Sequence, residues 1–222
     1  YINVPASWVV QLPDGLTLQE SMLLGTAGFT AALAMHNLLR CGLNPQDGEL
    51  LVTGASGGVG SLSIAIAAAN GFNVTASTGK LEEIEYLKHL GAKNVIDRSL
   101  VDDKSAKLLL RPQWAAAIDT VGGNTLATIL KALLPHGSVA CCGNVASPLL
   151  NSSVFPFILN GVNLLGVNSA TTPMPLRQEL WQKLAAEWKP DLQKIRTTIA
   201  DLHTIHHYIE LIRSGKITGR VN

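Results

Sequence analysis

A glycine-rich turn between an apolar run and an alanine-rich segment constrains the fold of this chain more than any other feature. The apolar run covers residues 50–52, and the alanine-rich segment after the turn stops at Gly71. This order predicts a strand, a tight turn and a helix, because glycine accepts a sharp bend and also ends helices. The turn itself reads Thr53-Gly54-Ala55-Ser56-Gly57-Gly58-Val59-Gly60.

The start of the predicted helix favours a bound phosphate. Its first N–H groups have no partner within the helix, and the positive end of the helix dipole lies there. Glycines also let a pyrophosphate approach the backbone closely. A turn that serves only the packing of strand on helix is the alternative. The flanking strand and helix favour phosphate binding instead, at Ser56, Gly57, Gly58, Val59 and Gly60.

Length and composition bound the class of protein. The 222 residues suffice for one large domain or two small ones with a buried core. The net charge of +1 gives no reason to expect nucleic acid or a membrane surface as a partner. No uninterrupted apolar run reaches the ~18 residues of a membrane span. The three cysteines make no disulfide framework, so we expect a reducing, cytoplasmic location.

Strand-like and helical segments alternate through most of the chain, which predicts parallel strands joined by helices. The predicted strands are short apolar runs without alternation, as expected for a sheet covered on both faces. They cover residues 50–53, 73–77, 94–96, 115–119, 138–142 and 163–167. Helices are predicted at residues 21–39, with a break near Gly25 to Gly28, and at 81–90 and 124–134. The fold class is therefore α/β, a doubly wound parallel sheet of the Rossmann kind with six strands.

The alternation ends after Ser169, and this change suggests the domain boundaries. Residues 1–20 are expected to form a connection, and residues 21–169 the dinucleotide-binding domain. Residues 170–222 are expected to form a C-terminal segment with its own elements. These are a helix at 176–188, a strand-like run at 195–199, a helix at 203–214 and a closing run at 216–221.

The glycine turn fits two superfamilies of nicotinamide enzymes. Short-chain dehydrogenases need a tyrosine followed four residues later by a lysine. The residues four positions after Tyr1, Tyr86 and Tyr208 are proline, leucine and isoleucine. A short-chain dehydrogenase is therefore the less favoured alternative.

Further motifs resemble the zinc-free medium-chain dehydrogenase/reductases. Within that superfamily the chain resembles the acryloyl-CoA reductase (YhdH/AcuI) type of the quinone oxidoreductase-like enzymes. Besides the glycine turn, the likeness rests on residues 25–31, 45–49, 118–122, 155–159, 166–169 and 219–220.

The resemblance implies an NADPH-dependent oxidoreductase that delivers hydride to an activated carbon–carbon double bond or a quinone. An enoyl thioester such as acryloyl-CoA would be the small-molecule substrate, and a homodimer is compatible with it. Members of this family begin with a barrel-like domain, and residues 170–222 would pack toward it. We expect the present chain to lack that domain and to bind cofactor without turning over alone. The alternative is a catalytically inactive nucleotide-binding or structural homologue.

The end of the second predicted strand favours NADPH over NADH. NAD-binding folds place an acidic residue about 20 positions past the glycine turn, where it accepts hydrogen bonds from the ribose. This chain has Ser77-Thr78-Gly79-Lys80 there, two hydroxyls and an ammonium that would bind a 2′-phosphate. The alternative is that Lys80 begins a solvated helix and that Glu82 or Glu83 turns to the ribose. Arg98, just past the third strand, is a further candidate for the adenosine phosphate.

Asn168 and Ser169 follow the sixth predicted strand, at the carboxyl edge where open α/β sheets bind ligands, and an ordinary strand-end loop is the alternative. The remaining cofactor residues follow from the resemblance. It assigns Gly143, Asn144, Asn168 and Ser169 to the nicotinamide end, with Ile158 nearby. It also assigns Thr26 and Arg220 to the cofactor site. No residue qualifies as the catalytic acid, and none is named.

No metal site is expected. Zinc-dependent relatives have a cysteine ligand at the position that Thr26 occupies here, and a threonine hydroxyl cannot replace a thiolate. Cys41, Cys141 and Cys142 have no ligand spacing to a histidine. The cluster His203, His206 and His207 lacks a further ligand at useful spacing, so a partly solvated helix is the better interpretation.

Overall fold

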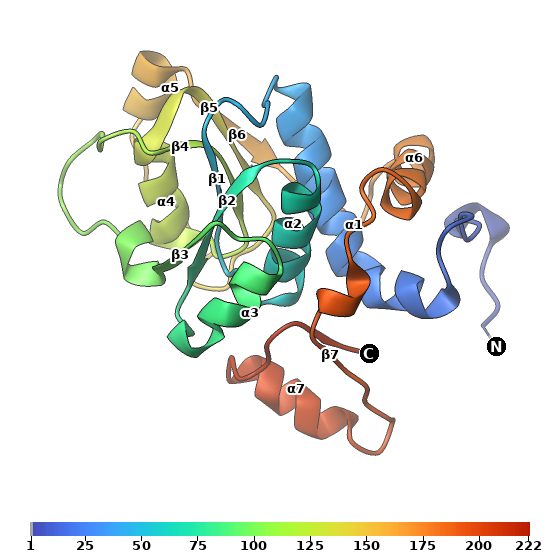
Figure 1. Ribbon diagram of the computed structural model, residues 1–222. Helices are drawn as coiled ribbons and strands as arrows, with labels where there is room; N and C mark the ends of the chain where they lie inside the picture. The colour runs from blue at the N-terminus through green and yellow to red at the C-terminus, as the bar shows by residue number, and fades with distance from the viewer. Residues whose placement is uncertain (1) are drawn as a thin grey trace.

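The computed structural model describes residues 2–222, and Tyr1, the first residue of the predicted connection, lies outside them. A six-stranded sheet in the order β3-β2-β1-β4-β5-β6 forms its centre (Figure 1). All neighbouring strands are parallel. The strands are β1 (Glu49–Val52), β2 (Asn73–Thr78), β3 (Asn94–Asp97), β4 (Trp114–Asp119), β5 (Leu133–Cys141) and β6 (Asn163–Gly166). The predicted fold class and all six predicted strands are confirmed.

Helices cover both faces of this sheet. Helices α1, α2 and α3 pack on one face, and α4 and α5 pack on the other (Figure 1). Successive residues of β1 point to opposite faces, so Leu50 and Val52 join one core while Leu51 joins the other. The helices are α1 (Leu18–Arg40), α2 (Gly58–Ala69), α3 (Ile84–His89), α4 (Gly123–Ala132), α5 (Phe155–Asn160), α6 (Met174–Ala185) and α7 (Ile205–Arg213).

Helix α1 is a core element with a kink. It begins at a capping box between Thr17 and Glu20 and bends at Gly25, whose φ of 49° and ψ of −149° lie outside the helical region. By length and hydropathy α1 qualifies as a candidate membrane span, although the sequence has no uninterrupted apolar run. In this structure 61% of the qualifying window is buried inside the fold. Phe29 and Met35 are among its fully buried side chains.

The C-terminal segment forms elements of its own, as predicted, but shorter ones. Strands β7 (Thr197–Thr198) and β8 (Arg220–Val221) make a separate parallel pair. Helix α7 lies apart from the central sheet in Figure 1. Helix α4 ends at Ala132, before the predicted end at residue 134, because Leu133 already pairs with Trp114 of β4. Helix α5 was not predicted as a helix, and its residues served only as a family motif.

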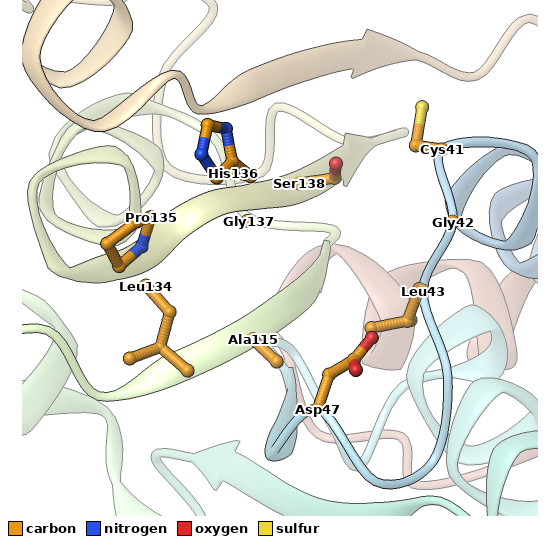
Figure 2. Close-up of a pocket in the computed structure, with 10 residues that line it drawn as sticks. All are labelled: Cys41, Gly42, Leu43, Asp47, Ala115, Leu134, Pro135, His136, Gly137 and Ser138. Carbon is orange, nitrogen blue, oxygen red and sulfur yellow. The ribbon is translucent and has the colours of Figure 1, made fainter.

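A hollow of about 360 Å³ lies at the amino-terminal edge of the sheet, opposite the edge where doubly wound folds bind ligands (Figure 2). One of its walls is the turn Pro135-His136-Gly137 at the start of β5. Within residues 2–222, His136 is the one residue other than glycine with a positive φ, at 64°. That conformation costs an L-residue about 1–2 kcal/mol.

We expect the substitution His136→Gly to raise the free energy of unfolding by about 0.5–1 kcal/mol. Glycine adopts the left-handed conformation without steric cost, and its larger entropy in the unfolded chain removes part of the gain. Urea denaturation of both proteins measures the difference. The substitution His136→Ala is the matched control, because it removes the imidazole but keeps the strained backbone. A stabilised alanine variant would contradict the explanation by strain.

Candidate cofactor-binding site

A cleft of about 730 Å³ opens at the carboxyl-terminal edge of the sheet. The sheet order reverses between β1 and β4, the place where parallel sheets bind ligands in the crevice between loops. Of the predicted cofactor residues, six line this cleft: Ser56, Ser77, Thr78, Gly79, Lys80 and Arg98. Its other walls come from the loops that follow β3, β4 and β5.

The glycine turn forms as predicted between β1 and α2. It is closed by a hydrogen bond from the Gly57 N–H to the Gly54 carbonyl, at 2.9 Å. Gly57 caps α2 with an extended backbone, so the N–H groups of Gly58, Val59 and Gly60 lie in the first turn, without helical partners. A Cβ atom on Gly60 would collide with the Gly54 carbonyl oxygen. Only glycine therefore lets α2 start this close to the turn.

Arg220 reaches the same helix end from the C-terminal segment. Its Nε donates to the Leu23 carbonyl at 2.9 Å. Its two Nη atoms lie about 3 Å from where Cβ atoms on Gly25 and Gly58 would stand (3.0 and 3.1 Å). The guanidinium thus sits between the kink of α1, next to Thr26, and the start of α2.

Arg220 is half-buried, and burial lowers the pKa of its guanidinium. Among residues 2–222 no carboxylate forms an ion pair with it. A half-buried cation beside a helix N-terminus fits an anionic ligand, because both contribute positive potential at one point. The residues present therefore fit a pyrophosphate.

Lys80 lines the cleft, but its ammonium is already engaged. It donates to the Ile217 carbonyl at 2.6 Å and to Thr218 Oγ1 at 3.3 Å. The sequence did not predict this contact with a segment 137 residues further along the chain. Glu83, one of the acids considered for the ribose, instead pairs with Arg196 at 2.7 Å. Glu82 does not line the cleft.

Arg98 lies along the β2 loop. A Cβ atom on Gly79 would stand 2.8 Å from both the Cδ and the Nε of Arg98, so the glycine makes room for this side chain. Arg98 is exposed, and it forms no ion pair within the described chain. Its neighbour Asp97 accepts a hydrogen bond from the Ser99 N–H at 2.8 Å, and the contacts with Ser99 lower the pKa of Asp97.

The sequence reasoning missed Asp119 as a site residue. This fully buried carboxylate accepts hydrogen bonds from Thr53 Oγ1 at 2.6 Å and from the Gly122 N–H at 2.8 Å. Burial raises the pKa of Asp119, and these hydrogen bonds oppose the rise. Asp119 therefore ties the end of β1 to the turn after β4, two walls of the cleft. Its position at the end of a strand was the available signal.

The residues assigned to the nicotinamide end lie near the carboxyl ends of β5 and β6, outside the 730 Å³ cleft. The Gly143–Asn144 backbone packs against Gly122, where a Cβ atom would stand 3.0 Å from the Gly143 carbonyl oxygen. Ser169 is held through its carbonyl by Arg177 at 2.7 Å. Asn168 is bonded through its side-chain amide to Thr171 Oγ1 at 2.7 Å.

Ile158 is 67% exposed on α5, and it does not line the cleft. Its assignment to the nicotinamide end stays a prediction. Helix α5 ends at Gly161, which contacts the ring of His136 at the amino-terminal edge of the sheet. The chain reaches α5 before it enters β6, so this helix belongs to the edge opposite the cofactor residues.

Among residues 2–222, no group of three or more histidine, cysteine, aspartate or glutamate side chains is placed so that it could hold a metal ion. All three cysteines are free thiols, and burial raises the pKa of Cys142 to about 12. The absence of zinc stays a prediction.

Comparisons with known proteins identify the family of this chain. Residues 58–188 match the family model described as zinc-binding dehydrogenase. YhfP of Bacillus subtilis, a proposed quinone oxidoreductase, is 43% identical over 222 residues, covering 100% of this chain and 67% of the relative. Acrylyl-CoA reductase AcuI of Ruegeria pomeroyi is 40% identical over 219 residues, covering 99% and 66%.

Two solved structures of oxidoreductase relatives are similar to this chain over nearly its whole length. The yhdH oxidoreductase from Salmonella enterica in complex with NADP superimposes with a TM-score of 0.93 at 39% identity, covering 97% of this chain and 66% of that one. The yhfP protein of Bacillus subtilis with NAD bound also gives 0.93, at 43% identity, covering 98% and 67%. The chain spans about two thirds of the length of these relatives. It belongs to the zinc-binding dehydrogenase family, in the medium-chain group that contains YhfP and AcuI.

Proposed function

We propose that this chain binds NADPH along the carboxyl-terminal edge of the sheet, with the adenosine end in the cleft, and is the cofactor-binding part of a reductase. The observation that carries the proposal is the pairing of the glycine turn with Arg220, a half-buried cation that has no carboxylate partner in the described chain. The N–H groups of Gly58, Val59 and Gly60 and the Arg220 guanidinium would hold the pyrophosphate. Thr26 lies beside Gly25, against which Arg220 packs.

The 2′-phosphate would be bound at the end of β2. Ser77, Thr78, Lys80 and Arg98 offer two hydroxyls and two cations around Gly79, and residues 77–80 contain no acid. Asp97, at the end of β3, pairs with Thr78 in the sheet and also lines the cleft, and its carboxylate accepts a hydrogen bond from the Ser99 N–H. An acid at the end of β2 would instead favour the free ribose hydroxyls of NADH.

We propose that the acceptor is an activated carbon–carbon double bond, first of all an enoyl thioester such as acrylyl-CoA. The name of the relative from Ruegeria pomeroyi supports this choice. A quinone is the second candidate, and the name of the Bacillus subtilis relative supports it. When bound, the reduced nicotinamide supplies the hydride. This chain's residues align the cofactor through Gly143, Asn144, Asn168 and Ser169.

The acceptor is tested by mass spectrometry of the thioester. The protein that carries this sequence is incubated with NADPH and acrylyl-CoA, and with NADPH and a soluble quinone in a parallel arm. We expect one propanoyl-CoA for each NADPH consumed. NADPH consumption only in the quinone arm would mean that the acceptor is a quinone and not the enoyl thioester. Consumption in neither arm would contradict the reductase proposal.

We expect the 222-residue chain alone to bind NADPH but to reduce acrylyl-CoA far below the ~1–10³ s⁻¹ usual for enzymes. This chain spans only about two thirds of the length of the relatives, and no described residue at the nicotinamide end is a carboxylic acid or a histidine that could donate a proton. Steady-state NADPH oxidation measures the rate. A rate within the usual range would show that these 222 residues hold the complete active site.

A further inference from the structure

Residues 217–220 form a strap that touches each phosphate-binding element of the candidate site. Lys80 of the β2 loop donates to the Ile217 carbonyl and to Thr218 Oγ1. The Gly219 N–H donates to the Ser56 carbonyl of the glycine turn at 2.9 Å. The side chain of Arg220 lies against Gly58 at the start of α2. Four consecutive residues thus reach the glycine turn with the adjoining start of α2 and the β2 loop, all of which are far from the strap in the sequence.

Contacts with Arg196 hold the strap in place. The Arg220 N–H donates to the Arg196 carbonyl at 2.9 Å. Gly219 has a φ of 78°, and a Cβ atom there would collide with the same carbonyl oxygen. The Arg196 guanidinium pairs with Glu83 at 2.7 Å and lies 4.5 Å from the ring centre of Tyr86. The strap is therefore attached to α3 and to the 3-10 turn that follows the β2 loop.

This attachment determines where the Lys80 ammonium stands. A lysine side chain is flexible and has three donors on its nitrogen. Two of them are directed to Ile217 and Thr218, which leaves one for a ligand in the cleft that Lys80 lines. The restraint lowers the entropy that Lys80 loses when it binds an anion.

We propose that Thr218 is a positioning residue for NADPH selectivity: its hydroxyl, together with the Ile217 carbonyl, holds the Lys80 ammonium at the 2′-phosphate subsite. The inference rests on the proposed function, because it needs a 2′-phosphate beside Lys80. It adds to that function by making the C-terminal segment part of the selectivity determinant. A purely structural Lys80, which only anchors the strap, would leave the preference between the two cofactors unchanged.

The test compares binding of NADPH and NADH to the wild-type chain and to Thr218→Val, which removes the hydroxyl but keeps the shape. The dissociation constant for NADPH should rise about threefold to tenfold, the effect of one lost hydrogen bond, and that for NADH should stay the same. Thr218→Ser restores the hydroxyl and should restore the affinity. Adenosine 2′,5′-bisphosphate and 5′-AMP, titrated by calorimetry, should give the same contrast without the nicotinamide.

A double-mutant cycle shows whether Thr218 acts through Lys80. In the Lys80→Ala background, Thr218→Val should have no further effect on NADPH affinity. The same loss in both backgrounds, equal losses for NADPH and NADH, or no loss would overturn the inference. Thr218→Ala takes the place of the valine variant if that variant does not fold. A wild-type chain that binds neither nucleotide would contradict the proposed function instead, so the two failures are distinguishable.

Discussion

The substitution Gly60→Ala is expected to lower the free energy of unfolding by about 2 kcal/mol and cofactor affinity by more than tenfold. A Cβ atom on Gly60 would collide with the Gly54 carbonyl oxygen and stand 2.8 Å from the Ala55 Cα. Both are backbone atoms of the glycine turn, so the turn and the start of α2 must move apart. The higher helix propensity of alanine offsets only about 1 kcal/mol of the cost.

Urea denaturation and NADPH titration of the same preparation measure both effects of Gly60→Ala. The matched control is Gly166→Ala in β6, because no atom lies within 4 Å of the Cβ position there. The control should keep wild-type stability and affinity. A Gly60→Ala protein with wild-type values would mean that the turn tolerates a side chain, against the close approach described here.

The substitution Arg220→Gln is expected to weaken binding of NADPH and NADH by the same factor, about 10- to 100-fold. The pyrophosphate is common to the two cofactors, and the substitution removes the positive charge beside it. Glutamine keeps a donor for the Leu23 carbonyl, which Arg220 Nε now serves. Stability should change little, because the cation has no carboxylate partner in the described chain that the substitution would leave unpaired.

The control for Arg220 is Arg213→Gln on α7, an exposed arginine in an ion pair with Glu210. It removes the same charge from the C-terminal segment without touching the glycine turn. Affinity should also fall with added salt for the wild type and much less for Arg220→Gln, since salt screens the charge interaction. Unequal losses for NADPH and NADH would mean that Arg220 contacts the adenosine end of the cofactor and not the pyrophosphate.

The sequence predicts the central fold because its signals are local. Each strand of the sheet is a short apolar run bounded by turn residues, and the Gly57–Gly60 turn joins a strand to a helix within a few residues. Parallel order and crossover handedness then follow from general rules. Six of the predicted cofactor residues line one cleft because the carboxyl ends of parallel strands share an edge.

The parts that sequence reasoning missed depend on contacts between distant residues. The Lys80 ammonium bonds to Ile217, 137 positions away, and no local pattern announces that pair. Asp119 gains its role from Thr53, the residue after β1, 66 positions away. The nicotinamide-end role of Ile158, on α5, was assigned by resemblance alone and stays a prediction. Strands β7 and β8 are two residues long, and they pair with each other although α7 lies between them in the sequence.

Equilibrium titration of the 222-residue chain with NADPH and with NADH tests the central claim most directly. The arrangement of Ser77, Thr78, Lys80 and Arg98, with no acid at the end of β2, predicts that NADPH binds at least tenfold more tightly. The similar yhfP protein of Bacillus subtilis has been solved with NAD bound, so tighter binding of NADH is the competing outcome that the titration must exclude. Equal affinity for the two cofactors, or tighter binding of NADH, would contradict the account.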